Sequence, residues 1–341
     1  MASDEALVTK LRGRFGDFLD AAQLDEILEE PDTDGELNQI RKILGQATES
    51  FDDVGAAERV IEKWFRMKSR ELLHFLGEKE RRFYETYLVS GEMIELRRFL
   101  QLLQRGERAE QLPFVFHSVY TERLHLPLDE SITIEEYLAT LSDLPYFRVL
   151  EPFLASGVSA ETMDLNVLNI NMDRWYFHQL LRETRAMNRS TARELKDLIG
   201  MRIDLRNIQW IYHVKQFEPS QNDYLPVQMV EGGKYVIGET LQRLIGNDLS
   251  ALVDWLRTSH YKALPEQDGT EMPYMPITIQ RILFDHCRHV FRRTTNGLVA
   301  TICFTIMLSA RVAEVRRVLE AKNLGMSKEQ ILPYLVEKTH Q

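Results

Sequence analysis

The sequence contains few clusters of the residue types that bind metals or carry out catalysis. The most suggestive segment is Asp285-His286-Cys287-Arg288-His289, which places three kinds of metal-binding side chain close together. On a helix, His286 and His289 would share one face, but Cys287 would point elsewhere, and no second pair of ligands follows nearby. We therefore interpret this segment as polar helix surface and predict no metal site in the chain.

The remaining candidate motifs for chemistry are incomplete. Asp32-Thr33-Asp34-Gly35 resembles the start of a calcium-binding loop, but it lacks the third acidic position and the closing Glu. The carboxylate pairs Glu135/Glu136 and Asp52/Asp53 lie beside predicted turns or on helix faces, where capping or solvated carboxylates are common. The sequence has neither a phosphate-binding Gly-x-x-x-x-Gly-Lys-Ser/Thr loop nor a Gly-x-Gly-x-x-Gly motif, and no Ser, Cys or Thr in a nucleophile motif. We predict no catalytic residue and no bound cofactor.

The composition is that of a globular protein in a reducing compartment. The chain has 341 residues, of which 44% are hydrophobic and 28% charged, and its net charge is −10. Such a charge argues against a general nucleic-acid binder, because binding to phosphates requires a basic surface. The net charge is −7 for residues 1–115, −5 for 116–226 and +2 for 227–341. This gradient could orient the chain on a partner, although ordinary variation among solvated helix faces would produce the same pattern. Two cysteines do not make a disulfide framework.

The sequence predicts no membrane-spanning segment. The first five residues are acidic at Asp4 and Glu5 and lack the pattern of a signal peptide. The longest apolar stretch runs from Gly297 to Ala310, which is shorter than the roughly 20 residues that cross a bilayer. We predict that this stretch is a buried core helix and that membrane association occurs only through another protein.

A short motif occurs three times at nearly equal spacing. It consists of an acidic residue, an aliphatic residue, Arg, and then Arg or Asn, and its copies begin at Glu95, Asp204 and Glu314. From each copy onward, apolar residues recur at the spacing that places them on one face of an amphipathic helix. We single out six positions as a structural signature of the repeat: Glu95, Arg97, Asp204, Arg206, Glu314 and Arg316.

Two further motifs recur with a similar period. Glu62-Lys63-Trp64-Phe65 is similar to Asp173-Arg174-Trp175-Tyr176, and residues 136–138 are similar to residues 239–241. The alternative explanation of these recurrences is chance similarity among helical segments rich in Glu, Leu and Arg. A period of about 110 residues indicates a triplicated domain, because solenoid repeats are much shorter. We therefore predict an all-α protein with three similar helical repeats at residues 1–115, 116–226 and 227–341, and we interpret residues 226–237 as a loop.

The acidic residues of the motif have two possible roles. We predict that Glu95, Asp204 and Glu314 hold each domain together, through pairs such as Glu95 with Arg98 and Glu314 with Arg317, or through bonds between helices. The alternative is that one ring of these charges lines a funnel between the domains.

The same segments carry a resemblance to a known family. Residues 83–103 (FYETYLVSGEMIELRRFLQLL) and 198–217 (LIGMRIDLRNIQWIYHVKQF) resemble signature helices of the C subunit of bacterial and archaeal V-type ATPases, the counterpart of the eukaryotic d subunit. Residues 173–177 and 310–335 are similar to two further elements of that family, whereas residues 1–55 match weakly. The resemblance extends from about residue 60 to residue 335.

The resemblance implies a fold and a role. The implied fold has three helical domains around a pseudo-threefold axis, which form a funnel. The implied role is that of a non-catalytic central-stalk subunit of a rotary V-type ATPase or ATP synthase. Such a subunit lies on the cytoplasmic face of the proteolipid ring as a peripheral membrane protein, receives the shaft subunits D and F, and transmits torque for ion transport. Two alternatives are a helical scaffold or adaptor unrelated to rotary machines, and an all-helical hydrolase.

Overall fold

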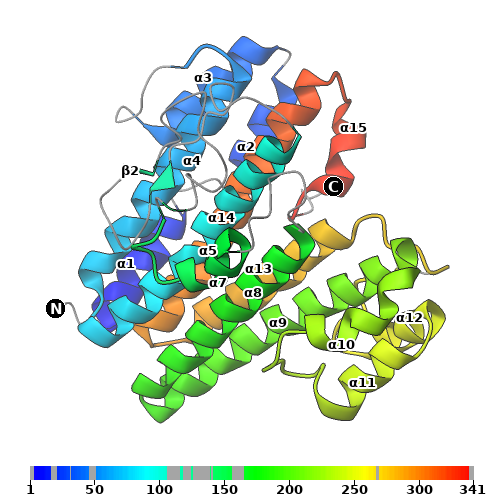
Figure 1. Cartoon of the computed structure of the whole chain (residues 1–341). Coiled ribbons are helices and arrows are strands. Elements are labelled where there is room, and N and C mark those ends of the chain that lie inside the picture. The colour runs from blue at the N-terminus through cyan, green and yellow to red at the C-terminus, as the bar shows by residue number, and fades with distance from the viewer. Residues whose placement is uncertain are drawn as a thin grey trace. The chain divides into compact units, whose positions relative to one another are not determined.

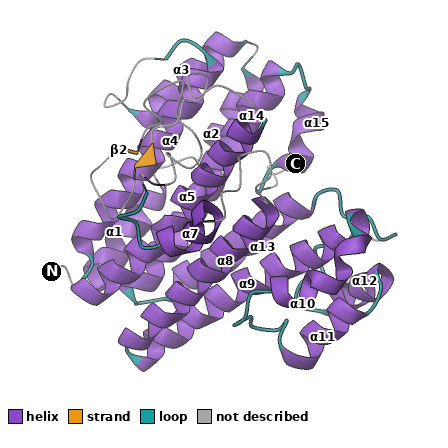
Figure 2. Cartoon of the chain, viewed as in Figure 1, coloured by secondary structure: helices purple, strands orange, loops and turns teal. Residues whose placement is uncertain are grey.

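The chain divides into two compact units. One comprises Met1–Gly77 together with Gly246–Gln341, and the other comprises Glu78–Ile245. The computed structural model, shown in Figures 1 and 2, describes residues 4–16, 21–30, 32–45, 51–105, 116–117, 124–125, 139, 141–155, 165–265 and 269–337.

The first unit is built around the long helix α14 (Gly297–Asn323), against which α1, α4 and α13 pack. The other regular elements described in this unit are also helices. They are α1 (Asp4–Gly16), α2 (Ala21–Glu29), α3 (Thr33–Leu44), α4 (Val54–Glu71), η1 (Leu72–Phe75), α12 (Leu249–Thr258), α13 (Met275–Arg293), α15 (Lys328–Ile331) and η6 (Leu332–Tyr334).

The second unit contains two long helices, α5 (Glu78–Gln104) and α9 (Arg189–Phe217), and α8 (Leu165–Glu183) packs against both of them. The smaller elements are β1 (Phe116–His117), β2 (Leu124–His125), α7 (Phe147–Ala155), η4 (Thr184–Ala186), η5 (Pro219–Tyr224), α10 (Leu225–Gln228) and α11 (Gly238–Gly246), the last of which ends at the unit boundary. β1 and β2 form a two-residue antiparallel pair, with Phe116 opposite His125.

A pair of consecutive helices recurs three times along the chain. The first helices of the pairs, α4, α8 and α13, begin at Val54, Leu165 and Met275. The second and longer helices, α5, α9 and α14, begin at Glu78, Arg189 and Gly297. Both series of helix starts are nearly evenly spaced and agree with the period of the sequence motifs. Each copy of the acidic motif lies on a second helix.

Polar residues at the helix starts explain where several of these helices begin. Asp32 and Asp53 cap α3 and α4, where their side chains accept hydrogen bonds from Gly35 N (2.8 Å) and Ala56 N (2.7 Å). Asn188 and Asn296 cap α9 and α14 in the same way. The partial calcium motif at Asp32 and the acidic pair at Asp52/Asp53 therefore belong to helix starts.

The apolar stretch from Gly297 to Ala310 forms the first half of α14. In the described part of the chain, α14 is the one helix long and apolar enough to cross a membrane, but 83% of its most apolar window is buried inside the structure. Leu298, Cys303 and Met307 are fully enclosed. This burial favours the predicted role of the stretch as a buried core helix over that of a membrane-spanning helix.

The all-α fold class is confirmed, with the two-residue β1–β2 pair as a small addition. Residues 226–237 contain the end of α10 and otherwise irregular backbone, and no strand, as predicted. The predicted correspondence between 136–138 and 239–241 cannot be compared, because 136–138 lies outside the described residues. The division into three repeats at 115/116 and 226/227 stays a prediction.

Candidate functional site: the charges of the repeated motif

Asp204 lies fully buried on α9 and binds the backbone of the segment that follows that helix. Its Oδ1 accepts hydrogen bonds from Lys234 N (3.0 Å) and Val236 N (3.1 Å), and its Oδ2 accepts one from Tyr235 N (2.7 Å). Three amide donors to one carboxylate are a strong arrangement, because hydrogen bonds to a charged acceptor are stronger than neutral ones. The first residue of the motif therefore fixes residues 234–236 to α9.

Glycines allow this close approach of the loop to α9. A Cβ atom at Gly233 would lie 2.1 Å from the Asp204 Oδ1, and one at Gly200 would lie 3.1 Å from the Lys234 N. Asn207, the last residue of this motif copy, adds two bonds to Val230: its Nδ2 donates to the carbonyl (2.8 Å) and its Oδ1 accepts from the amide (3.0 Å). The first and last positions of this copy thus hold the same loop.

Glu314 holds a different segment to α14. It is fully buried, and its Oε1 accepts hydrogen bonds from Val336 N (2.5 Å) and Glu337 N (3.0 Å). Its Oε2 accepts from Arg311 Nη1 at 2.9 Å, and Arg311 also pairs with the Glu337 carboxylate. Burial raises the pKa of the Glu314 carboxyl above its ordinary value, and the charge of Arg311 opposes that rise.

The predicted pairing of Glu314 with Arg317 is wrong. The ion pair that the structure gives for Glu314 is with Arg311, one turn earlier in α14. The Arg317 guanidinium instead donates to Gln280 Oε1 and to the Tyr334 carbonyl. Because residues 334–337 lie beside this part of α14, both arginines contribute to binding the C-terminal segment.

The arginines of the motif reach to neighbouring helices. Arg97 on α5 and Arg206 on α9 both bind Asp173 on α8, with N–O distances of 2.5 Å each. The Asp173 side chain is only 12% exposed, so this triad is largely removed from water. On α14, Arg316 lies 3.7 Å from Glu62 of α4 and forms a more exposed ion pair.

Two of these contacts follow the same rule. Arg97 belongs to the second helix of the first pair, and Asp173 belongs to the first helix of the second pair. Arg316 belongs to the second helix of the third pair, and Glu62 belongs to the first helix of the first pair. The two acidic partners, Glu62 and Asp173, occupy matching positions of the second repeated motif. Each of these two arginines thus contacts the acid of the next helix pair, counted cyclically.

Glu95 is the third acidic member of the signature and lies half-buried on α5. The predicted pair of Glu95 with Arg98 cannot be tested, because the Arg98 side chain is outside the described part of α5. Sequence reasoning missed Arg311 and Glu337 altogether. It also missed the role of Asp173, although its place in the second repeated motif was a usable signal.

The described residues contain no group of three or more His, Cys, Asp or Glu side chains placed to hold a metal ion. In the cluster at 285–289, Cys287 is buried in the core, whereas His289 is exposed on the opposite side of α13. Five of the six signature residues connect helices or anchor loops: Arg97, Arg206, Arg316, Asp204 and Glu314.

Comparison with known proteins points to one family. The family described as "ATP synthase (C/AC39) subunit" matches residues 7–334, which is nearly the whole chain. A 150-residue region is 23% identical to the C subunit of the A-type ATP synthase of Methanosphaera stadtmanae. This match covers 42% of the present chain and 38% of that relative, so it spans less than half the length of either protein.

Proposed function

Because the chain belongs to the ATP synthase (C/AC39) subunit family, we propose that it is the non-catalytic central-stalk rotor subunit of a rotary V-type ATPase or ATP synthase. In this role it would seat the shaft subunits D and F on the proteolipid ring. It would turn with them and transmit torque between the ATP-hydrolysing head and the ion-carrying ring. It would contact the membrane only through the ring, on the cytoplasmic face.

The observation that carries the proposal is the threefold recurrence of one helix pair. A scaffold that must surround a shaft can be built from similar units related by rotation, and a cyclic order of contacts is the expected consequence. Within the second unit, α5 packs against α8, and within the first unit, α14 packs against α4. In both contacts the second helix of one pair meets the first helix of the next pair, and the third pair returns to the first. This order supports a pseudo-threefold arrangement of three domains.

The charge network supports the mechanical part of the role. A part that transmits torque has to resist deformation, and densely packed helices with low compressibility do so. Loops are the usual weak points of such a structure. Here Asp204 and Asn207 hold one long connection, and Glu314 and Arg311 hold the C-terminal segment. The buried carboxylates thereby attach these segments firmly to the helices.

Co-purification tests the proposal. An affinity-tagged chain would be expressed in its native cell, the membranes would be solubilised in mild detergent, and bound proteins would be identified by mass spectrometry. We expect shaft, head and proteolipid subunits to be recovered together with the chain. A helical scaffold unrelated to rotary machines would recover none of them, and that result would overturn the proposal.

A further inference from the structure

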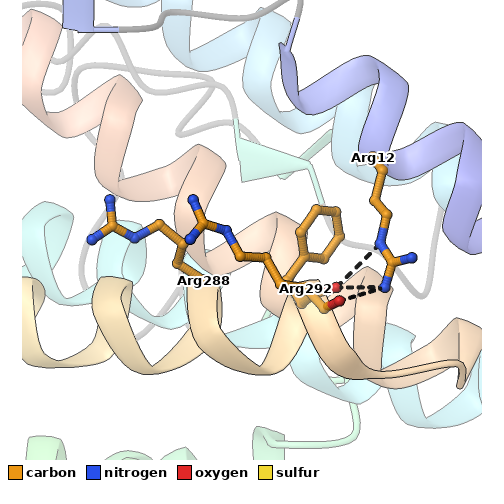
Figure 3. A pocket seen from close by; sticks show the side chains of 4 residues that line it. Arg12, Arg288 and Arg292 are labelled. Atoms are coloured by element: carbon orange, nitrogen blue, oxygen red, sulfur yellow. Dashed lines mark hydrogen bonds between the residues drawn. The ribbon is translucent and has the colours of Figure 1, made fainter.

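A cavity of about 330 Å³ lies in the first unit beside the C-terminal end of α13, and arginine side chains dominate its lining. Its lining residues are Arg12 from α1 and Arg288, Phe291 and Arg292 from α13. Figure 3 shows Arg288 and Arg292 extending from one helix, while Arg12 reaches toward the end of that helix from α1. None of these residues belongs to the repeated motif.

Arg12 is held in place by the end of α13. Its guanidinium donates to the carbonyls of Phe291 (3.1 Å), Arg292 (3.1 Å) and Thr294 (3.0 Å), as the dashed lines for the first two show in Figure 3. Carbonyls at a helix C-terminus lack hydrogen-bond partners within the helix, and this end of the helix dipole is negative. A cation there both donates hydrogen bonds to these carbonyls and interacts favourably with the dipole. All of these acceptors are neutral, and among the described residues Arg12 has no carboxylate partner.

Arg292 is the least neutralised charge of the cavity. It is exposed and forms no ion pair with any described residue. Arg288, one turn earlier on the same face, pairs with Asp285 (2.9 Å) and Glu337 (2.7 Å). The charge of Arg292 is therefore the one that an anion in the cavity would compensate most strongly.

We propose that this cavity binds a phosphate-bearing anion. A guanidinium presents a planar fork that binds phosphate through two parallel hydrogen bonds, and a phosphate monoester carries enough charge to engage more than one arginine. The cavity volume is at the lower end of the range for small-molecule sites, which leaves room for an organic group beside the phosphate. Phe291, which is 4% exposed, provides an apolar wall for such a group. The inference does not depend on the rotary role.

The phosphate could belong to a soluble compound or to a lipid headgroup. The full chain would be titrated with inorganic phosphate and glycerol phosphate by calorimetry at constant ionic strength, with chloride as the reference anion. Vesicles of phosphatidylglycerol and of phosphatidylcholine would be compared in a flotation assay. Saturable binding of the soluble compounds identifies the first source, and binding confined to phosphatidylglycerol vesicles identifies the second.

Arg292→Gln and Arg293→Gln form a matched pair of variants. Both side chains are exposed at the end of α13, but only Arg292 lines the cavity. We expect Arg292→Gln to weaken binding at least tenfold and Arg293→Gln to change it less than twofold, while both variants keep the helical circular-dichroism spectrum and melting temperature of the parent chain. Equal weakening by both variants would mean diffuse attraction to a basic surface and would overturn the proposal, as would the absence of saturable binding by every probe.

Discussion

Replacement of Asp204 by Ala would remove the anchor of residues 234–236. The three amides that donate to Asp204, Lys234 N, Tyr235 N and Val236 N, would lose a charged acceptor, and that of Val236 is buried. Hydrogen bonds to charged groups contribute about 1.5–3 kcal/mol each, so three bonds set an upper range of about 5–9 kcal/mol. The loop can relax and admit water, and the deletion of one partner of a buried charged network costs about 3–5 kcal/mol. We therefore expect the free energy of unfolding of Asp204→Ala to fall by about 4 kcal/mol.

The matched control is Asp197→Ala on the same helix. Asp197 is 54% exposed and also touches the loop, through an ion pair of 3.4 Å with the Lys234 ammonium. Exposed ion pairs contribute about 0–1 kcal/mol, so this variant should lose at most about 1 kcal/mol. The two variants remove the same chemical group from α9, and only its burial and its backbone partners differ.

Urea unfolding followed by two probes gives the measurement. Tryptophan fluorescence includes a signal from this region, because Trp210 is one of the four tryptophans and its indole donates a hydrogen bond to Gln228 Oε1 (2.8 Å) beside the loop. Circular dichroism reports on the helices as a whole, and coincident transitions would justify a two-state free energy. Hydrogen exchange should also be faster at the amides of residues 234–236 in Asp204→Ala. If Asp204→Ala were no less stable than Asp197→Ala, the carboxylate would not anchor the loop and our interpretation of the motif would be wrong.

Three other predictions concern single residues. Gly233→Ala should lower the midpoint of thermal unfolding by several degrees, because the new Cβ would lie 2.1 Å from Asp204 Oδ1. The control is Gly91→Ala on α5, where the new Cβ would meet open space and should stabilise the chain by about 0.5–1 kcal/mol. Equal thermal midpoints for the two variants would contradict the close packing at Gly233. Asp173→Ala leaves the guanidinium groups of Arg97 and Arg206 without their shared carboxylate, and it should lower the free energy of unfolding in urea by about 3–5 kcal/mol. A loss below about 1 kcal/mol, which is typical of an exposed ion pair, would refute the stabilising role of the triad. The raised pKa of Glu314 means that the folded state binds its proton more tightly than the unfolded state. Its contribution to stability is therefore present below the ordinary pKa of 4.5 and is lost as the pH rises through the raised value. The stability of the parent chain should fall more steeply with pH over this window than that of Glu314→Gln, and identical slopes would contradict the prediction.

The sequence predicted those features of the fold that repeat locally. Amphipathic periodicity identified the helical segments that begin at the three copies of the acidic motif, and the regular spacing of these copies agrees with the recurrence of the helix pairs. Asp173, Arg97 and Arg206 were all visible as members of repeated motifs, although the ion pairs between them were not predicted. These local signals depend only on residue types and spacing, and this is why they could be recognised before the fold was known.

The partners of the buried carboxylates could not be predicted in the same way. Asp204 binds amides 30 to 32 residues away, and Glu314 binds amides 22 and 23 residues away. Backbone amides carry no sequence signal, and the intervening turns decide which of them meets the carboxylate. The pairing of Glu314 with Arg311 and not with Arg317 could not be predicted either, because both arginines lie three residues from Glu314 on α14. Gly200 and Gly233 were local hints, since a loop that approaches a helix this closely leaves little room for a side chain at either position.

Electron cryo-microscopy of the intact complex would show where this chain lies relative to the shaft and the proteolipid ring. Membrane-extracted rotary ATPase from the cell that encodes this chain would be resolved well enough to trace helices α5, α9 and α14. We predict one copy of the chain between the shaft subunits and the proteolipid ring, with its three helix pairs arranged around the base of the shaft. A complex in which the shaft meets the ring directly, with this chain absent or bound elsewhere, would contradict the proposed role.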